Sequence, residues 1–249
     1  MLTNEQLDRY ARHIVLKEIG GSGQRRLLAA TVLVVGAGGI GSPAILYLAA
    51  AGVGTLRIVD DDAVGLDNLQ RQILFGTADV GRPKVAVAAE QVARLNPDVR
   101  VDAMRERLTN INVAGLLADA DVVLDGSDNF ATRLLVSDAS TAARVPLVSA
   151  AIGQFQAQVS GWRGWEADKP CYRCFVGDAF DADDCDSCSE LGLMGAMAGI
   201  AGSMGALEVL RQIVSFGGEA TGKLHIFDGL VPAMRTLRIV KDPGCSGCS

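Results

Sequence analysis

Histidines and basic runs are scarce in this 249-residue chain, and each scarcity narrows the possible functions. The two histidines, His13 and His225, leave few residues for a catalytic triad or a multi-histidine metal site. We therefore expect any catalysis to use other side chains. Acidic residues outnumber basic ones 29 to 23, the formal charge is −6, and no long Lys/Arg run occurs. This balance argues against nucleic acid or an anionic membrane as a partner.

A secretory signal and a membrane span are also missing from the sequence. The first ten residues lack the basic and then apolar pattern of a signal peptide. The uncharged stretch 191–207 is rich in glycine and is shorter than the ~20 residues that a membrane span needs. We expect a cytoplasmic protein, in which six cysteines indicate metal or thiol chemistry.

The order of apolar segments in the first 150 residues predicts an α/β fold. A capping box at Thr3–Gln6 begins a predicted amphipathic helix over residues 4–17, which the glycines of Gly20–Gly23 should end. Segments typical of buried strands then alternate with helical segments: strands 31–35, 55–59, 99–104, 121–125 and 146–149, and helices 41–52, 83–95 and 130–143. This alternation predicts a Rossmann-like, doubly wound, mostly parallel sheet.

The rest of the chain differs in kind. Segments 155–162, 224–228 and 237–240 are typical of strands that short connections pair antiparallel. Four glycines between them recur at helical spacing: Gly192, Gly195, Gly199 and Gly202. They favour a core helix that packs closely against another helix, or against its own copy in a dimer.

A glycine-rich turn follows the first predicted strand. The segment Gly36-Ala37-Gly38-Gly39-Ile40-Gly41 has the pattern G-x-G-x-x-G between a strand and a helix, where backbone amides and the helix dipole bind phosphate. Asp60 ends the next strand, where a carboxylate accepts hydrogen bonds from ribose hydroxyls. The fingerprint alone favours NAD or FAD, and a glycine turn without a ligand is the plainer alternative.

Polar residues in the next loop change this interpretation. Asn68, Arg71 and Gln72 follow Asp60, and Lys84 begins the following helix. A single loop cation is most often a solvated surface charge, but a cluster of cations suits the charge of a triphosphate and of departing pyrophosphate.

Two further polar residues follow strand 121–125. Asp128 and Asn129 lie at a carboxyl end, the edge at which doubly wound sheets bind ligands. Asp128 is suited to Mg²⁺, which prefers carboxylate oxygens together with phosphates. Its alternative role is to cap the next helix, a role that Asn129 could fill instead.

The six cysteines form three C-x-x-C pairs, and two such pairs make a tetrahedral zinc site. The pairs are Cys171/Cys174, Cys185/Cys188 and Cys245/Cys248, and spacing alone leaves open which two combine. If the first and last combine, the middle pair is left as free thiols in an acidic segment. Cys188 is then a nucleophile or sulfur acceptor, or an incidental thiol whose pKa the neighbouring aspartates raise.

In their order along the chain these motifs resemble the MoeB/ThiF family, bacterial relatives of ubiquitin-activating enzymes. The resemblance spans nearly the whole chain and is carried by Arg9-Tyr10-Ala11-Arg12, the glycine turn at 36–41, Asp60, Asn68-Leu69-Gln70-Arg71-Gln72, Gly81-Arg82-Pro83-Lys84, Asp125-Gly126-Ser127-Asp128-Asn129, Pro170-Cys171-Tyr172-Arg173-Cys174 and Pro243-Gly244-Cys245-Ser246-Gly247-Cys248.

The resemblance implies an assignment for each candidate residue. ATP binds at the turn of Gly36, Gly38, Gly39 and Gly41, with Asn68, Gln72 and Asn129 around it. Asp60 binds the ribose, Arg71 and Lys84 the phosphates, and Asp128 lies near Mg²⁺. Zn²⁺ is bound by one set of four cysteines: Cys171, Cys174, Cys245 and Cys248.

The resemblance also implies partners. Family members form homodimers in which an N-terminal arginine, matched here by Arg12, enters the neighbouring subunit's ATP site. Cys188 matches the cysteine that forms a covalent link to the carrier in ThiF-like members, whereas a second thiol at Cys185 departs from that pattern. The chain resembles the short form without a fused rhodanese domain, so sulfur is expected from a separate sulfurtransferase.

The expected reaction is adenylyl transfer. The C-terminal glycine carboxylate of a ubiquitin-like sulfur carrier attacks the α-phosphate of ATP, and no general base is needed because a carboxylate is already ionised. We expect one adenylation domain: a helical arm at 1–30, a nucleotide-binding half at 31–150, and a zinc-bearing, carrier-docking half at 151–249. The alternatives are an NAD-dependent oxidoreductase and a non-catalytic zinc scaffold that binds a ubiquitin-like protein. The sequence leaves open whether the carrier serves molybdopterin, thiamine or another sulfur-requiring pathway.

Overall fold

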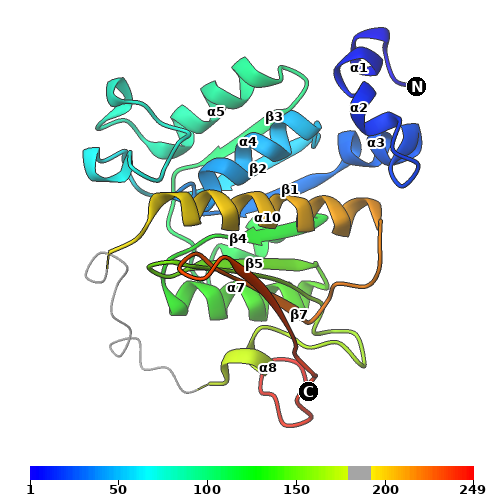
Figure 1. Ribbon diagram of the computed structural model, residues 1–249, viewed down its shortest axis with the longest axis vertical. Coiled ribbons are helices and arrows are strands. Elements are labelled where there is room, and N and C mark those ends of the chain that lie inside the picture. The colour runs from blue at the N-terminus through cyan, green and yellow to red at the C-terminus, as the bar shows by residue number, and fades with distance from the viewer. Residues whose placement is uncertain (179–191) are drawn as a thin grey trace.

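The computed structural model describes residues 1–178 and 192–249 of the chain. A single mixed sheet runs through this part, in the strand order β3-β2-β1-β4-β5-β6-β7-β8 (Figure 1). Its parallel strands are β1 (Thr31–Val35), β2 (Thr55–Val59), β3 (Arg100–Met104), β4 (Val122–Asp125) and β5 (Leu147–Ile152). Its antiparallel continuation is β6 (Gln156–Trp162), β7 (Lys223–Asp228) and β8 (Ala233–Arg238). The predicted Rossmann-like sheet with an antiparallel extension is confirmed.

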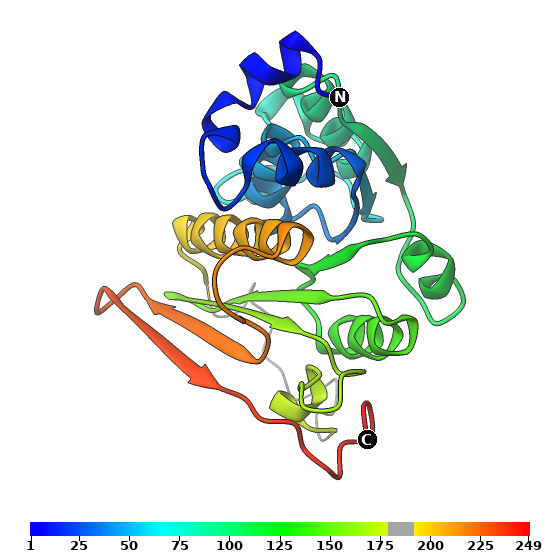
Figure 2. The same cartoon turned by 90° about the vertical axis from the view of Figure 1, so that its right-hand side faces the viewer.

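Helices cover both faces of this sheet. They are α1 (Asn4–Arg9), α2 (Ala11–Ile14), α3 (Gly20–Ala29), α4 (Gly41–Ala51), α5 (Lys84–Leu95), α6 (Val113–Leu117), α7 (Phe130–Ala143), α8 (Arg173–Val176) and α10 (Gly195–Val214), with 3-10 turns η1 (Leu66–Asn68) and η2 (Thr77–Asp79). Val32 and Val34 of β1 pack with α4, α5 and α10, whereas Leu33 packs with α6 and α7. Figure 2 shows α10 and α7 on opposite sides of the strands.

The N-terminal arm differs from the predicted single helix over 4–17. The capping box at Thr3 is present, but the helix stops after Arg9 and resumes at Ala11. The cause lies at Tyr10, which is buried and accepts a 2.8 Å hydrogen bond at its Oη from Asn96 Nδ2. Gly52, the left-handed cap of α4, makes room for this ring, since a Cβ there would lie 2.4 Å from Tyr10 Oη.

Two other boundaries are also wrong. The glycines at 20–23 form the first turn of α3 instead of only ending a helix, and Gly23 lies close to α10, since a Cβ there would lie 2.8 Å from Val214 Cγ1. The last strand is Ala233–Arg238, not 237–240. It starts early because Asp228 accepts hydrogen bonds from the backbone N–H groups of Leu230 and Val231 and so tightens the preceding turn.

Two of the four glycines, Gly195 and Gly202, pack closely as predicted, whereas a Cβ on Gly199 would meet no atom within 4 Å. A Cβ on Gly202 would lie 2.3 Å from the carbonyl oxygen of Ile40, and one on Gly195 would lie 2.2 Å from that of Gln70. Helix α10 therefore approaches the start of α4 more closely than any other residue type permits. Gly192, by contrast, precedes the helix and has a positive φ of 76°. Among the described helices, α10 included, none is both long and apolar enough to span a bilayer.

The contact between Tyr10 and Gly52 yields a stability prediction. Gly52→Ala adds a methyl group that must displace the Tyr10 ring, whereas Gly81→Ala adds one at a similar φ of 86° with no atom within 4 Å. We expect Gly81→Ala to lower the free energy of unfolding by about 1 to 2 kcal/mol through backbone strain. Gly52→Ala should lose about 1 to 3 kcal/mol more by overpacking. Urea unfolding measures both, and equal losses would contradict the contact.

Candidate nucleotide site and cysteine cluster

The glycine turn lies where the strand order of the sheet reverses. Strand β1 is flanked by β2 on one side and β4 on the other, so the crossovers that follow β1 and β4 diverge at this point. A Cβ on Gly36, whose φ is +87°, would lie 3.3 Å from the carbonyl oxygen of Gly126. A Cβ on Gly41 would lie 2.0 Å from the carbonyl oxygen of Gly36. The two loops thus meet backbone to backbone at the crevice where open α/β sheets bind ligands.

Asp60 holds the glycine turn in place. Its Oδ2 accepts a 2.8 Å hydrogen bond from the Ala37 N–H, and its Oδ1 accepts one of 2.9 Å from the Asp62 N–H. Burial raises the pKa of Asp60, while the charge of Lys84 and these two amides oppose the shift. The sequence predicts that Asp60 binds a ribose but does not show that it also holds the turn. This second role arises because the fold places Asp60 beside Ala37, 23 residues earlier in the chain.

Two of the predicted loop residues lie against the glycine turn. The aliphatic part of Arg71 covers Gly39, where a Cβ would lie 3.4 Å from Arg71 Cγ. Gln72 is buried beside Gly38, and its Oε1 has no hydrogen-bond partner among the described residues. A buried acceptor without a partner is costly, so this amide is available for a ligand or water. Asn68 lies one turn earlier, where its Oδ1 accepts from the Gly65 N–H.

Lys84 is the first residue of α5 and lies near Asp60. Its side chain is 5% exposed, and its Nζ donates to Asp62 Oδ2 over 2.8 Å. Asp62 itself is 65% exposed, so this partner is partly hydrated and can exchange for another anion. The structure therefore places the predicted Lys84 cation beside Asp60.

The loop after β4 carries the other predicted pair. Asn129 caps α7, since its Oδ1 accepts a 2.9 Å hydrogen bond from the Thr132 N–H, and Asp128 is exposed. The backbone of Ser127 is held at two points: its N–H donates to Asp125 Oδ1, and its carbonyl oxygen accepts from Arg133 Nη2. Burial raises the pKa of Asp125. Sequence reasoning missed this clamp because Arg133 lies a helical turn beyond the motif.

The fold keeps Arg12, another predicted site residue, away from the glycine turn of its own chain. It is exposed on α2, next to Tyr10, which contacts the C-terminal cap of α4. The glycine turn precedes the opposite end of α4, and an 11-residue helix is about 16 Å long. Figure 1 shows α2 on the side of the molecule where α10 ends, away from the side where α10 begins.

Four cysteines from distant segments converge near the C-terminus. The Sγ of Cys171 lies 3.9 Å from that of Cys174 and 3.5 Å from that of Cys245, and the Sγ atoms of Cys174 and Cys248 are 3.4 Å apart. Tetrahedral zinc with bonds of about 2.3 Å needs sulfurs about 3.8 Å apart. The cluster fits such an ion and combines the first and last C-x-x-C pairs. Cys185 and Cys188 lie outside the described residues.

Two thiols of this cluster, those of Cys171 and Cys248, have pKa values raised above the ordinary value of a cysteine. Burial raises the pKa of Cys171 and raises that of Cys248 to about 11. Both are protonated at pH 7 when no cation is bound, and a metal ion requires thiolates. Metal binding must therefore release protons.

Zinc affinity should consequently rise with pH. Two thiols that lose a proton on binding give an apparent affinity that increases by up to about a hundredfold for each pH unit. Calorimetric titration of the metal-free protein between pH 6 and pH 8, in buffers of different ionisation enthalpy, measures the affinity and the protons released. An affinity that stays constant across this range would contradict the cluster as a zinc site.

Comparisons with known proteins agree with this geometry. A sequence profile described as "ThiF family" matches residues 10–247. The chain is 42% identical over 254 residues to a sulfur carrier protein adenylyltransferase of Thermus thermophilus, covering 99% of this chain and 92% of that one. It is 41% identical over 246 residues to the sulfur carrier protein ThiS adenylyltransferase of Escherichia coli K12, covering 96% and 94%.

A solved structure has the same fold at lower identity. The crystal structure of Escherichia coli MccB with MccA-N7isoASN superposes with a TM-score of 0.82 at 21% identity, over 97% of this chain and 75% of that chain. The fold, the glycine turn at the strand-order reversal and the match over residues 10–247 lead to one conclusion. The chain belongs to the ThiF family.

Proposed function

We propose that this chain is an ATP-dependent adenylyltransferase that activates the C-terminal glycine carboxylate of a ubiquitin-like sulfur carrier protein. The observation that carries the proposal is the packing of Arg71 over Gly39, which brings the aliphatic part of an arginine against the glycine turn while its Nη1 donates to the Asp67 carbonyl oxygen over 3.2 Å. Hydride transfer needs no such cation, whereas attack on a triphosphate does. The relatives named as sulfur carrier adenylyltransferases support the same reaction.

Each predicted site residue then has a task. The amides of Gly36, Gly38, Gly39 and Gly41 hold phosphate at the start of α4. Asp60 accepts from the ribose while it braces the turn, Asn68, Gln72 and Asn129 complete the nucleotide site, and Asp128 holds Mg²⁺. Arg71 and Lys84 neutralise the phosphates, and Lys84 exchanges Asp62 for a phosphate oxygen.

The chemical step is a displacement at the α-phosphorus. An oxygen of the carrier carboxylate forms a bond to this phosphorus, the bond to the bridging oxygen of the β-phosphate breaks, and pyrophosphate leaves with the electron pair. The attacking carboxylate is ionised at neutral pH, so the protein needs only to align it and to stabilise the charge on the leaving group. A bound Mg²⁺ adds to that stabilisation.

Arg12 completes the site of a second copy in a homodimer. The length of α4 separates Arg12 from its own glycine turn, so it reaches a phosphate only across an interface. An apolar surface near it suits such an interface: Tyr47 and Leu207, which are 58% and 50% exposed, line one pocket together with His13. A cavity of about 600 Å³ lies beside Arg71 and is lined by the first half of α10, from Gly195 to Met204.

The later steps involve the second half of the chain. This half docks the carrier, its zinc fixes the C-terminal segment, and Cys188 accepts the carrier or its sulfur. Sulfur comes from a separate sulfurtransferase. The carrier belongs to the thiamine or the molybdopterin pathway.

Pyrophosphate exchange tests the role of Asp128. Purified protein with carrier, ATP and Mg²⁺ should exchange labelled pyrophosphate into ATP. Asp128→Ala should lower the exchange rate at least about a hundredfold, because the variant lacks the carboxylate that holds Mg²⁺, and the charge on the phosphates is then less stabilised. The melting temperature should stay unchanged. Asp168→Ala, at an exposed aspartate of the second half, is the control and should exchange at the wild-type rate. Undiminished exchange by Asp128→Ala would remove this residue from the mechanism.

Mixing two inactive variants tests whether Arg12 acts across the dimer. Arg12→Ala and Asp128→Ala should each be inactive alone. After mixing and subunit exchange, half of the dimers are mixed, and each has one site with both residues intact. Exchange activity should therefore return to about a quarter of the wild-type value. If Arg12 served its own subunit, no mixture would regain activity.

A further inference from the structure

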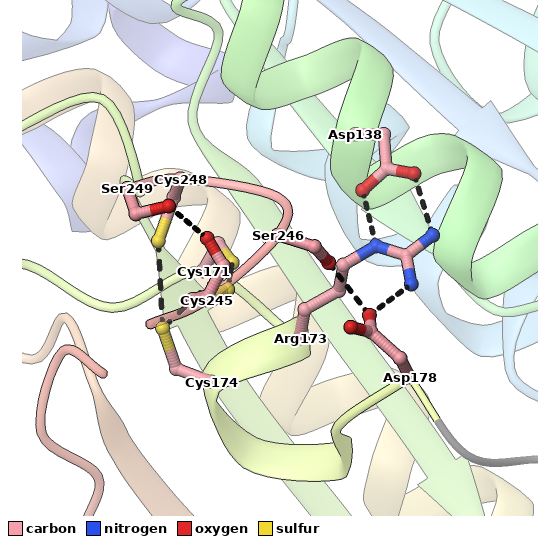
Figure 3. A network of polar contacts seen from close by, with 9 residues as sticks. All are labelled: Asp138, Cys171, Arg173, Cys174, Asp178, Cys245, Ser246, Cys248 and Ser249. Atoms are coloured by element: carbon pink, nitrogen blue, oxygen red, sulfur yellow. Dashed lines mark hydrogen bonds and ion pairs between the residues drawn. The ribbon is translucent and has the colours of Figure 1, made fainter. Parts of the chain in front are cut away.

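One arginine joins the cysteine cluster to α7. Arg173 lies between Cys171 and Cys174, and Figure 3 shows its guanidinium between two carboxylates. Its Nε and Nη2 donate to the two oxygens of Asp138, both over 2.7 Å. This paired arrangement fixes direction as well as distance. The first C-x-x-C pair is thereby fastened to the third turn of α7.

The same arginine also supports the second C-x-x-C pair. Its Nη1 donates to Asp178 Oδ1 over 2.8 Å, and the Ser246 hydroxyl donates to the same oxygen over 2.7 Å. The backbone at Gly247 rests on the arginine, since a Cβ there would lie 2.7 Å from Arg173 Cδ and 3.2 Å from Asp138 Oδ1. Arg173 thus lies within one C-x-x-C segment and contacts the turn that carries the other.

Charge compensation does not account for this network. The two carboxylates of Asp138 and Asp178 outnumber the single guanidinium, so the group adds negative charge beside four cysteines. Negative charge disfavours thiolates, which a metal site must form. The contribution of the network to metal binding is therefore geometric: it sets where the two cysteine pairs lie relative to each other.

We propose that Arg173 is the positioning residue of the metal site, which through its paired hydrogen bonds to Asp138 holds the two C-x-x-C segments at ligand spacing. The proposal goes beyond adenylyl transfer and beyond the four cysteine ligands. The Arg173 guanidinium donates its hydrogen bonds to carboxylates, so this residue acts through the cysteine ligands and not on the metal. Metal retention by this chain then depends on α7 as well as on the cysteines.

Zinc release measures this dependence. The zinc-loaded full chain is mixed with a chromogenic chelator, and the release rate is compared for wild type, Arg173→Gln, Asp138→Asn and the double variant. Arg57→Gln is the matched control, because Arg57 is as exposed as Arg173 (18% against 19%), also pairs with an aspartate, and lies on β2. We expect both single variants to release zinc at least about tenfold faster than wild type and the control. The double variant should be no faster than the faster single variant.

Two further measurements make the outcome decisive. Arg173→Lys keeps the charge but cannot form the pair of parallel bonds, so it should release zinc as fast as Arg173→Gln. In cobalt-loaded protein both should alter the thiolate-to-cobalt absorption, which Arg57→Gln should leave unchanged. Wild-type release by Arg173→Gln, full rescue by lysine, or effects that multiply in the double variant would each overturn the proposal. If Arg173→Gln does not fold, the release rate of Asp138→Asn decides by the same criterion: tenfold faster release supports the proposal, and wild-type release overturns it.

Discussion

The close backbone contact between the loops after β1 and β4 is the constraint on which the site depends. A Cβ on Gly36 would lie 3.3 Å from the carbonyl oxygen of Gly126 in the other loop, and the absence of a Cβ on Gly41 lets the glycine turn fold back onto the carbonyl oxygen of Gly36. Because the two strands are neighbours at the reversal of strand order, this contact brings the glycine turn to the loop of Asp128. A larger residue at Gly41 would clash with the Gly36 carbonyl oxygen, and one at Gly36 would be strained at a φ of +87° and crowd Gly126.

Contacts made by residues outside the glycine turn hold the two loops together. Asp60 anchors the turn through the Ala37 amide, and α10 presses on the start of α4 through Gly202. At the other end of α4, Tyr10 and its partner Asn96 fasten the N-terminal arm. Helix α4 therefore connects the glycine turn with the N-terminal arm, which lies about 16 Å away.

The sequence predicts the sheet, the glycine turn and the family because each depends on local pattern. Continuous apolar runs identify strands buried on both faces, and C-x-x-C spacing identifies the cysteine pairs. The misses depend on contacts between distant segments. Tyr10 breaks a helix that its periodicity favours because burial beside Gly52 outweighs helix propensity, and β5 continues to Ile152 because β6 pairs with its last residues. The family resemblance, but not the cysteine spacing, predicts which two pairs combine, and the link through Arg173 follows only from the fold.

The most direct test of the account is the mass of the carrier after incubation with this protein, ATP and Mg²⁺. Candidate carriers that end in Gly-Gly are offered together, and intact-protein mass spectrometry follows them over time. The account predicts that one carrier gains the mass of a single adenylate and that a carrier without its last glycine gains none. Unmodified carriers throughout, together with tight NADH binding by the protein, would contradict it.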